Sequence, residues 1–146
     1  MPVIYGKYAG KTTEELVLKR PDWAQWMVEN YPGSPVSRSI HELVTKLNRR
    51  KFTKKCAECG RAATQASAFQ NTGSLMFWCD HCNPYGSGAR DGTLTVVSTF
   101  RAALLHVDMT CDGRRTDKRR IIKEFARGKG LQRRVGAAHA ADFFAI

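Results

Sequence analysis

The sequence lacks any run of eighteen apolar residues, which is about the least that a membrane-spanning helix requires. It also lacks the apolar core of a signal peptide, because its first residues read Met-Pro-Val-Ile-Tyr-Gly-Lys. Internal repeats and low-complexity tracts are absent. We therefore expect a globular protein of the cytoplasm with no membrane partner. Thiols stay reduced in that compartment, so its cysteines are more typical of metal ligands than of disulfides.

Acidic residues are scarce. The sequence has thirteen Asp and Glu residues and 24 Lys and Arg residues, which gives a formal net charge of +11. An excess of this size favours a polyanionic partner, and nucleic acid is the most common one. The excess is concentrated in residues 49–61, with a net charge of +5, and residues 111–134, with +7. The alternative is a pair of merely solvated faces, but a solubilising surface usually mixes both signs.

A chain of 146 residues, 42% of them hydrophobic, suits one compact body or two small modules. Thr12 and Glu15 have the spacing of a capping box at a helix start. Ser34 followed by Pro35 predicts the start of another helix. We expect an α+β fold in three parts that form one body. These are a strand-helix module with a further helix over 1–50, a zinc ribbon over 51–92 and a basic helical region over 93–146.

The spacing of hydrophobic residues predicts the individual elements. They are a strand over 3–8, a helix from residue 13 that Pro21 interrupts, helices over 22–29 and from 35 to the basic turn 48–51, a hairpin of 62–69 and 74–78, a loop over 83–88, a strand over 93–97, a helix from residue 100, and a last helix from about 116 to 128 or 130.

Four of the five cysteines form two Cys-x2-Cys pairs, Cys56 with Cys59 and Cys79 with Cys82, and nineteen residues separate the pairs. Two residues between cysteines let one tight turn direct both sulfurs at the same point, and zinc binds four such ligands in a tetrahedron. The intervening hairpin would bring the two turns together. This spacing is typical of a zinc ribbon that holds one structural Zn²⁺. A redox role is the less favoured alternative, and Cys111 is expected to be a small buried residue.

The two basic segments supply candidate phosphate contacts. Lys and Arg side chains neutralise phosphates with little choice of sequence. Aromatic residues near the ribbon, namely Phe69, Phe77, Trp78 and Tyr85, could stack on unpaired bases. Alternatively, Phe77 or Trp78 fills a small core. The candidate nucleic-acid contacts are Arg49, Arg50, Lys51, Lys54, Lys55, Trp78, Arg114, Arg115, Lys118, Arg119, Arg120, Lys123 and Arg127, and we expect the two segments to form one positive surface.

Near the N-terminus the sequence contains Tyr5-Gly6-Lys7-Tyr8-Ala9-Gly10-Lys11-Thr12, followed by Glu14, Glu15, Asp22 and Trp26. This pattern resembles the small module at the C-terminus of exodeoxyribonuclease X-like proteins, which short phage and bacterial proteins also carry alone. The resemblance covers residues 4–30. It implies handling of nucleic acid, with DNA ahead of RNA, in replication, recombination or regulation, and it does not extend to the nuclease domain.

Two other functions remain open. A metal-dependent nuclease would need clustered carboxylates, and the candidates are scattered over Asp80, Asp91, Asp108, Asp112 and Asp117. We therefore expect no catalysis. A protein-binding adaptor or inhibitor of a nucleic-acid-processing complex is the second alternative. It would use the apolar tail, residues 137–146, which could instead pack back on the body.

Overall fold

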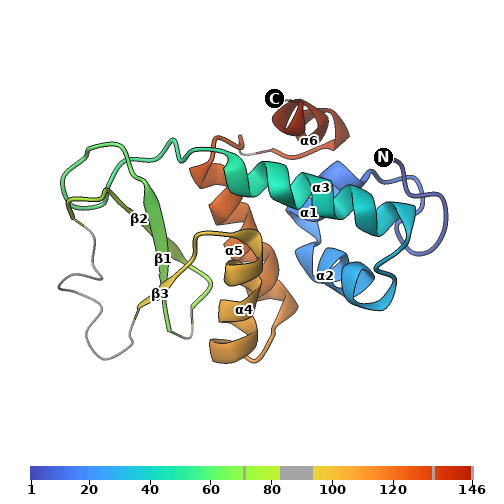
Figure 1. Cartoon of the computed structure of the whole chain (residues 1–146), viewed down its shortest axis with the longest axis horizontal. Helices are drawn as coiled ribbons and strands as arrows, with labels where there is room; N and C mark the ends of the chain where they lie inside the picture. Colours follow the sequence, from blue (N-terminus) through green and yellow to red (C-terminus); the bar gives the residue numbers. More distant parts are fainter. Residues whose placement is uncertain (71, 83–93, 133, 146) are drawn as a thin grey trace.

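The computed structural model describes residues 1–70, 72–82, 94–132 and 134–145. Over these residues the fold is α+β, with a small sheet at one end and the helices gathered at the other (Figure 1). The elements are α1 (Thr13–Lys19), α2 (Pro21–Asn30), α3 (Pro35–Arg49), β1 (Gln65–Phe69), β2 (Leu75–Trp78), β3 (Leu94–Val96), α4 (Phe100–Thr110), α5 (Arg115–Gly128) and α6 (Ala137–Phe144). No helix in these ranges has the length and hydropathy to cross a membrane.

Three helices begin at side-chain caps. The hydroxyl of Thr12 accepts from the backbone N–H of Glu15, that of Ser34 from Ser37, and that of Thr99 from Ala102. Each cap pairs one backbone donor that the first helical turn leaves without a partner. The starts expected from the sequence at residues 13, 35 and 100 are therefore confirmed.

The strand predicted over residues 3–8 is wrong. These residues form a looped turn that is closed by backbone bonds from Val3 N to Lys11 O and from Gly10 N to Val3 O, both 2.8 Å. Gly6 and Gly10 each have a φ of +87°, which glycine adopts without strain. An extended strand over 3–8 cannot pass through Gly6 in this conformation. We name residues 3–11 the N-terminal loop.

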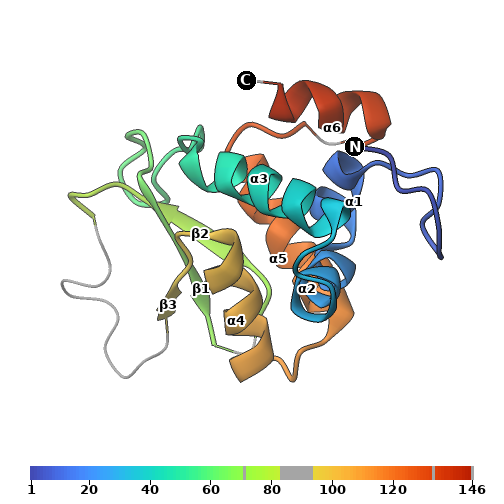
Figure 2. The ribbon, with the colours of Figure 1, turned by 45° about the vertical axis from the view of Figure 1, so that its right-hand side comes forward.

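Helix α5 lies at the centre of the molecule, between α4 and the pair α1–α2 (Figure 2). Its Ile121, Ile122, Phe125 and Ala126 have no exposed surface, as the sequence predicted for the first three. The same hydrophobic core includes residues of α1, α3, α4, β1 and α6. Burial of these side chains is the main term that holds the helices together.

The chain segments meet where α3 ends. The buried Lys129 donates from its Nζ to the carbonyl oxygens of Leu47 (3.0 Å) and Asn48 (2.8 Å) in the last turn of α3. The Leu47 carbonyl also accepts from the backbone N–H of Arg50 (3.3 Å). The Asn48 side chain accepts from the backbone N–H of Phe100 (2.8 Å), at the first turn of α4. Arg50 donates to the carbonyl oxygens of Lys129 and Phe143. This junction therefore joins α3, α4, α5 and α6.

The sheet is antiparallel with strand order β2-β1-β3. The predicted hairpin is confirmed, since Gln65 pairs with Trp78 and Ala68 with Leu75. Strand β3, expected near its observed place, adds to the free edge of β1. The sheet thus crosses the boundary drawn at residue 92.

Hydrogen bonds fix the sheet, and the segment that precedes it, to the helices. The backbone N–H of Leu75 in β2 donates to the carboxylate of Glu124 (2.8 Å), and that of Thr53, before the first cysteine pair, donates to the carbonyl of Gly128 (2.7 Å). The tail forms α6, whose Phe143 and Phe144 are 7% and 4% exposed, so its apolar face packs back on the body.

Candidate functional site

The four cysteines of the ribbon form a group that can hold a metal ion. Their sulfur atoms all lie within 4.8 Å of one another, and those of Cys59 and Cys79 are 3.5 Å apart. A tetrahedron with metal–sulfur bonds of about 2.3 Å places its sulfurs about 3.8 Å apart, so these spacings fit one ion. Cys56 and Cys79 are buried and Cys59 is exposed, which puts the centre at the surface of the sheet end.

Backbone geometry directs the sulfurs inward. The first turn closes from Gly60 N to Cys56 O (3.1 Å), with Gly60 at a φ of +75°. The second turn is tied to the start of β1 through Asp80, which accepts from the side-chain amide of Gln65 in that strand (3.2 Å) and from the hydroxyl of the preceding Thr64 (2.6 Å). This anchoring role of Asp80 was not deduced from the sequence, although an acidic residue between two ligands was a visible signal.

The thiols share protons unevenly. The backbone N–H of Cys59, with those of Cys79 and Glu58, lowers the pKa of the Cys56 thiol from its ordinary 9.0 to about 6. A hydrogen bond with the Cys59 thiol, together with burial, raises the pKa of Cys82. Backbone donors therefore stabilise a thiolate at Cys56, which is the form that binds metals.

The predicted nucleic-acid contacts fall into different environments. Arg50 is held in the junction, where its guanidinium also lies 4.1 Å from the Phe143 ring centre. Trp78 is half-buried and donates from Nε1 to the Ser67 hydroxyl (2.8 Å), so its indole N–H is already hydrogen-bonded within the sheet. Phe77 packs edge-on against Phe52, with ring centres 5.6 Å apart. Tyr85 and the predicted loop over 83–88 lie outside the described residues.

Several cations of α5 are paired within the protein. Lys118 bonds Asp108 (2.9 Å), and Arg119 forms a forked pair with Asp22 (3.1 and 3.3 Å). Arg114, just before the helix, bonds Asp117 (2.8 Å). Arg127 is half-buried. Lys118, Arg119 and Arg114 therefore place part of the predicted positive charge in ion pairs.

The remaining predicted contacts are exposed. Among the residues that the structure describes, none of them has a carboxylate within 4 Å. They form two sets. The helix cations are Arg115, Arg120 and Lys123 of α5, and the ribbon cations are Arg49, Lys51, Lys54 and Lys55.

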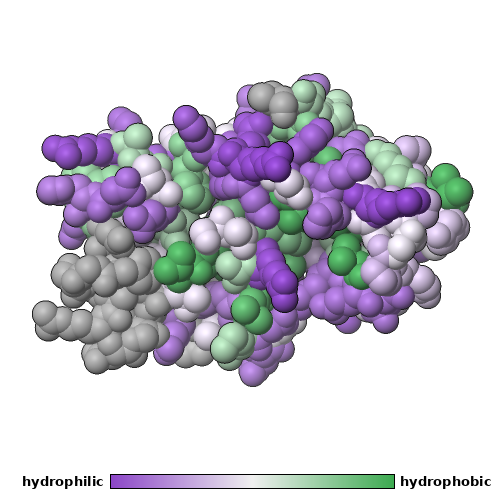
Figure 3. Space-filling view, viewed as in Figure 1, coloured by the Kyte–Doolittle hydropathy of each residue, from purple (hydrophilic) through white to green (hydrophobic). Residues whose placement is uncertain are grey.

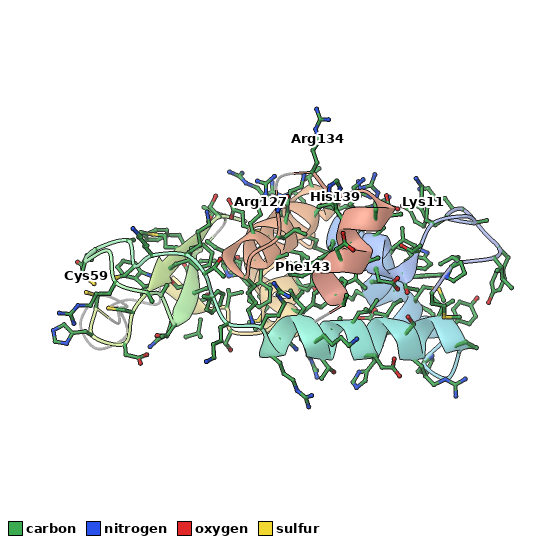
Figure 4. The ribbon with its side chains drawn as sticks, turned by 90° about the horizontal axis from the view of Figure 1, so that it is seen from above. Lys11, Cys59, Arg127, Arg134, His139 and Phe143 are labelled. Carbon is green, nitrogen blue, oxygen red and sulfur yellow. The ribbon has the colours of Figure 1, made fainter. Side chains whose placement is uncertain are left out.

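The two sets belong to segments that meet only locally. Thr53 and Arg50 contact the end of α5 at Gly128 and Lys129, and α3 runs along one edge of the molecule in the view from above (Figure 4). Arg127 and Arg134 lie on the side away from α3, and Cys59 lies at the end of the ribbon. The single positive surface expected from the sequence remains a prediction.

The carboxylates considered for a nuclease are used elsewhere or lie apart. Asp108 accepts from Lys118 and Gln25, and Asp112 sits in the turn after α4 with a φ of +56°. Asp91 lies outside the described residues. Within the described ranges, the four cysteines are the group of at least three side chains that could hold a metal. Cys111 is 1% exposed at the end of α4, as expected.

Comparison of the chain with known protein families, with curated proteins and with solved structures finds no match in any of the three.

Proposed function

We propose that this protein is a zinc-stabilised nucleic-acid-binding protein, with DNA the preferred partner over RNA. The observation that carries the proposal is the set of helix cations, Arg115, Arg120 and Lys123, which are exposed without carboxylate partners among the described residues. At about 100° per residue they lie within about 140° of one another around α5, and so share one face. Such a row contacts successive phosphates.

The acidic residues of the same helix form no ion pair with the helix cations among the described residues. Asp117 is bound to Arg114, and Glu124, which keeps its negative charge, accepts from the backbone N–H of Leu75. The resemblance of residues 4–30 to modules that accompany DNA nucleases is the reason for placing DNA ahead of RNA.

Zinc is the proposed metal because four thiolates are the donor set of structural zinc sites. When bound, Zn²⁺ would replace the protons shared by Cys56, Cys59, Cys79 and Cys82 and hold the two turns together. Four thiolate ligands leave no open position for water, so the metal has a structural role in this proposal. The resulting centre carries a charge of −2, which the nearby ribbon cations Lys54 and Lys55 would offset. For this reason the helix cations carry the nucleic-acid argument and the ribbon cations do not.

The salt dependence of binding tests the proposal. We would compare the double variant Arg120→Gln/Lys123→Gln with Arg38→Gln/Arg101→Gln, which removes the same charge from exposed positions on α3 and α4. The association constant falls as salt rises, so log K against log salt has a negative slope. Loss of two phosphate contacts should make this slope less steep by about 1.4 for a single strand and about 1.8 for a duplex. The matched control should keep the wild-type slope. Equal slopes for the two double variants, or binding that does not change with salt, would contradict the proposal. Elemental analysis should give one zinc per chain.

A further inference from the structure

An aromatic groove lies at the opposite end of the molecule from the ribbon. It is a hollow of about 530 Å³ between the N-terminal loop and α2, lined by Tyr5, Tyr8, Trp23, Trp26 and Tyr31 together with aliphatic side chains. This volume lies in the range of ligand pockets. Tyr8 packs edge-on against Trp23 (ring centres 5.4 Å apart) and Trp26 against Tyr31 (5.6 Å). We name this hollow the aromatic groove.

The groove exposes aromatic surface that the fold leaves uncovered. Tyr5 is 66% exposed, Tyr31 55% and Trp26 48%. At this end the space-filling view shows pale and green atoms among the purple ones (Figure 3). Contiguous exposed apolar surface on a protein commonly marks a binding site.

The wall formed by the N-terminal loop is held in place before any ligand arrives. The backbone bonds between Val3, Gly10 and Lys11 close the loop, and Ala9 N donates to Gly6 O (3.2 Å) within it. Binding to such a wall costs little ordering of the chain.

Cations border the groove on the side of α5. Lys7 lies 5.5 Å from the ring centre of Tyr8. A second hollow of about 430 Å³ shares Lys7, Tyr8, Trp23 and Trp26 with the groove, and it extends to Arg115, Lys118 and Arg119. The lining of this second hollow includes four cations and two carboxylates, Asp22 and Glu29. Arg115 is also the first of the helix cations, so the phosphate row and the groove are continuous.

We infer that the aromatic groove takes an unpaired base of a nucleic-acid strand whose phosphates lie along the helix cations. Aromatic faces stack on any base, and neighbouring cations hold the phosphate chain that carries it. This inference rests on the proposed function and deepens it, because it makes single strands or strand ends the preferred substrate over intact duplex. The continuity of aromatic and cationic surface favours this ligand over an apolar peptide, which needs no cations.

The experiment compares Trp26→Ala with Leu105→Ala in the full, metal-loaded protein. Leu105 is a large apolar residue of similar exposure, 52%, on α4, and it lines neither hollow. Fluorescence anisotropy would measure binding to an oligothymidylate strand, to the same strand with abasic sites, and to a duplex. Trp26→Ala should weaken binding to oligothymidylate about 5- to 100-fold. It should leave the salt slope and the binding of abasic strand unchanged, and Leu105→Ala should bind like wild type.

The outcomes separate this inference from the proposed function. Salt-dependent binding that Trp26→Ala leaves intact overturns the groove alone and assigns it to another class of ligand, such as a peptide. Equal loss on all three nucleic acids also overturns it, because stacking requires a base. Binding of none of them overturns both proposals. Tyr5→Ala, which removes a more exposed wall of the groove, should repeat the loss if Trp26→Ala does not fold.

Discussion

Gly128, the last residue of α5, lies where the ribbon packs on the helices, and replacing it with alanine probes this contact. A Cβ at this position would lie 2.4 and 2.6 Å from the Cε1 and Cζ atoms of Phe77. Ordinary contact begins at 3.4 Å, so the ring would have to retreat by about 1 Å. Phe77 packs against Phe52, which in turn packs against Phe125, with ring centres 6.0 Å apart. The displacement would therefore reach the core of α5.

Two effects oppose each other in Gly128→Ala. Overpacking of this kind costs about 1–3 kcal/mol. Replacing glycine by alanine in a helix contributes up to about 1 kcal/mol of stability, and less at the last helical position. The cost of the clash should exceed the gain in helix propensity, with a net loss of about 1–2 kcal/mol in the free energy of unfolding. For a chain of this size that lowers Tm by roughly 2–8 °C.

Urea and thermal unfolding, followed by circular dichroism at fixed metal concentration, would measure the loss. Gly33→Ala is the matched control, because a Cβ at Gly33 meets nothing within 4 Å. It should change the free energy of unfolding by less than about 0.5 kcal/mol. If Gly128→Ala is as stable as wild type or more stable, the close packing of Phe77 on α5 is refuted.

Three further predictions follow from the site and the junction. Chelation of the metal, or Cys59→Ser, should lower Tm and disturb the ribbon, since metal binding and folding of such a segment are one equilibrium; unchanged Tm after measured metal loss would count against the site. Burial, with the charge of Arg50, lowers the pKa of Lys129 from 10.5 to about 8. Between these values the unfolded chain binds more protons than the folded chain, so the stability of wild type relative to Lys129→Met should rise as pH increases from 8 to 10.5. Urea titrations at several pH values would measure it, and a difference in the free energy of unfolding that does not change with pH would contradict the prediction. Arg50→Lys should cost about 1–3 kcal/mol in urea unfolding, because one ammonium cannot serve both carbonyls and the Phe143 ring, whereas no loss would deny the clamp.

The sequence predicted what depends on local spacing. Cysteine pairs two residues apart, the caps at Thr12 and Ser34, and the buried stripe of Ile121, Ile122 and Phe125 all have short-range signatures. The α+β class and the clustering of the four cysteines followed from these signals and are confirmed.

Long-range partners could not be deduced in the same way. The charge run of α5 gave no sign that Arg119 would pair with Asp22, 97 residues away, or Lys118 with Asp108 on the preceding helix. Nor did it show that Lys129 would be buried beneath the end of α3. The hydrophobic residues Val3, Ile4 and Tyr5 predicted a strand over 3–8, but the positive φ of Gly6 and Gly10 depends on the closed loop as a whole.

The junction at the end of α3 also determines how the protein can be dissected. Lys129 donates to carbonyls in the last turn of α3, although about eighty residues separate it from that helix in the sequence. The Asn48 side chain accepts from the first turn of α4, which begins about fifty residues later. A fragment cut out around the cysteines would lose the partners of Thr53 and Leu75, and the remaining helices would lose the sheet that covers them. The segments 1–50, 51–92 and 93–146 are therefore expected to fold and unfold together. Separated fragments should regain structure only when they are mixed.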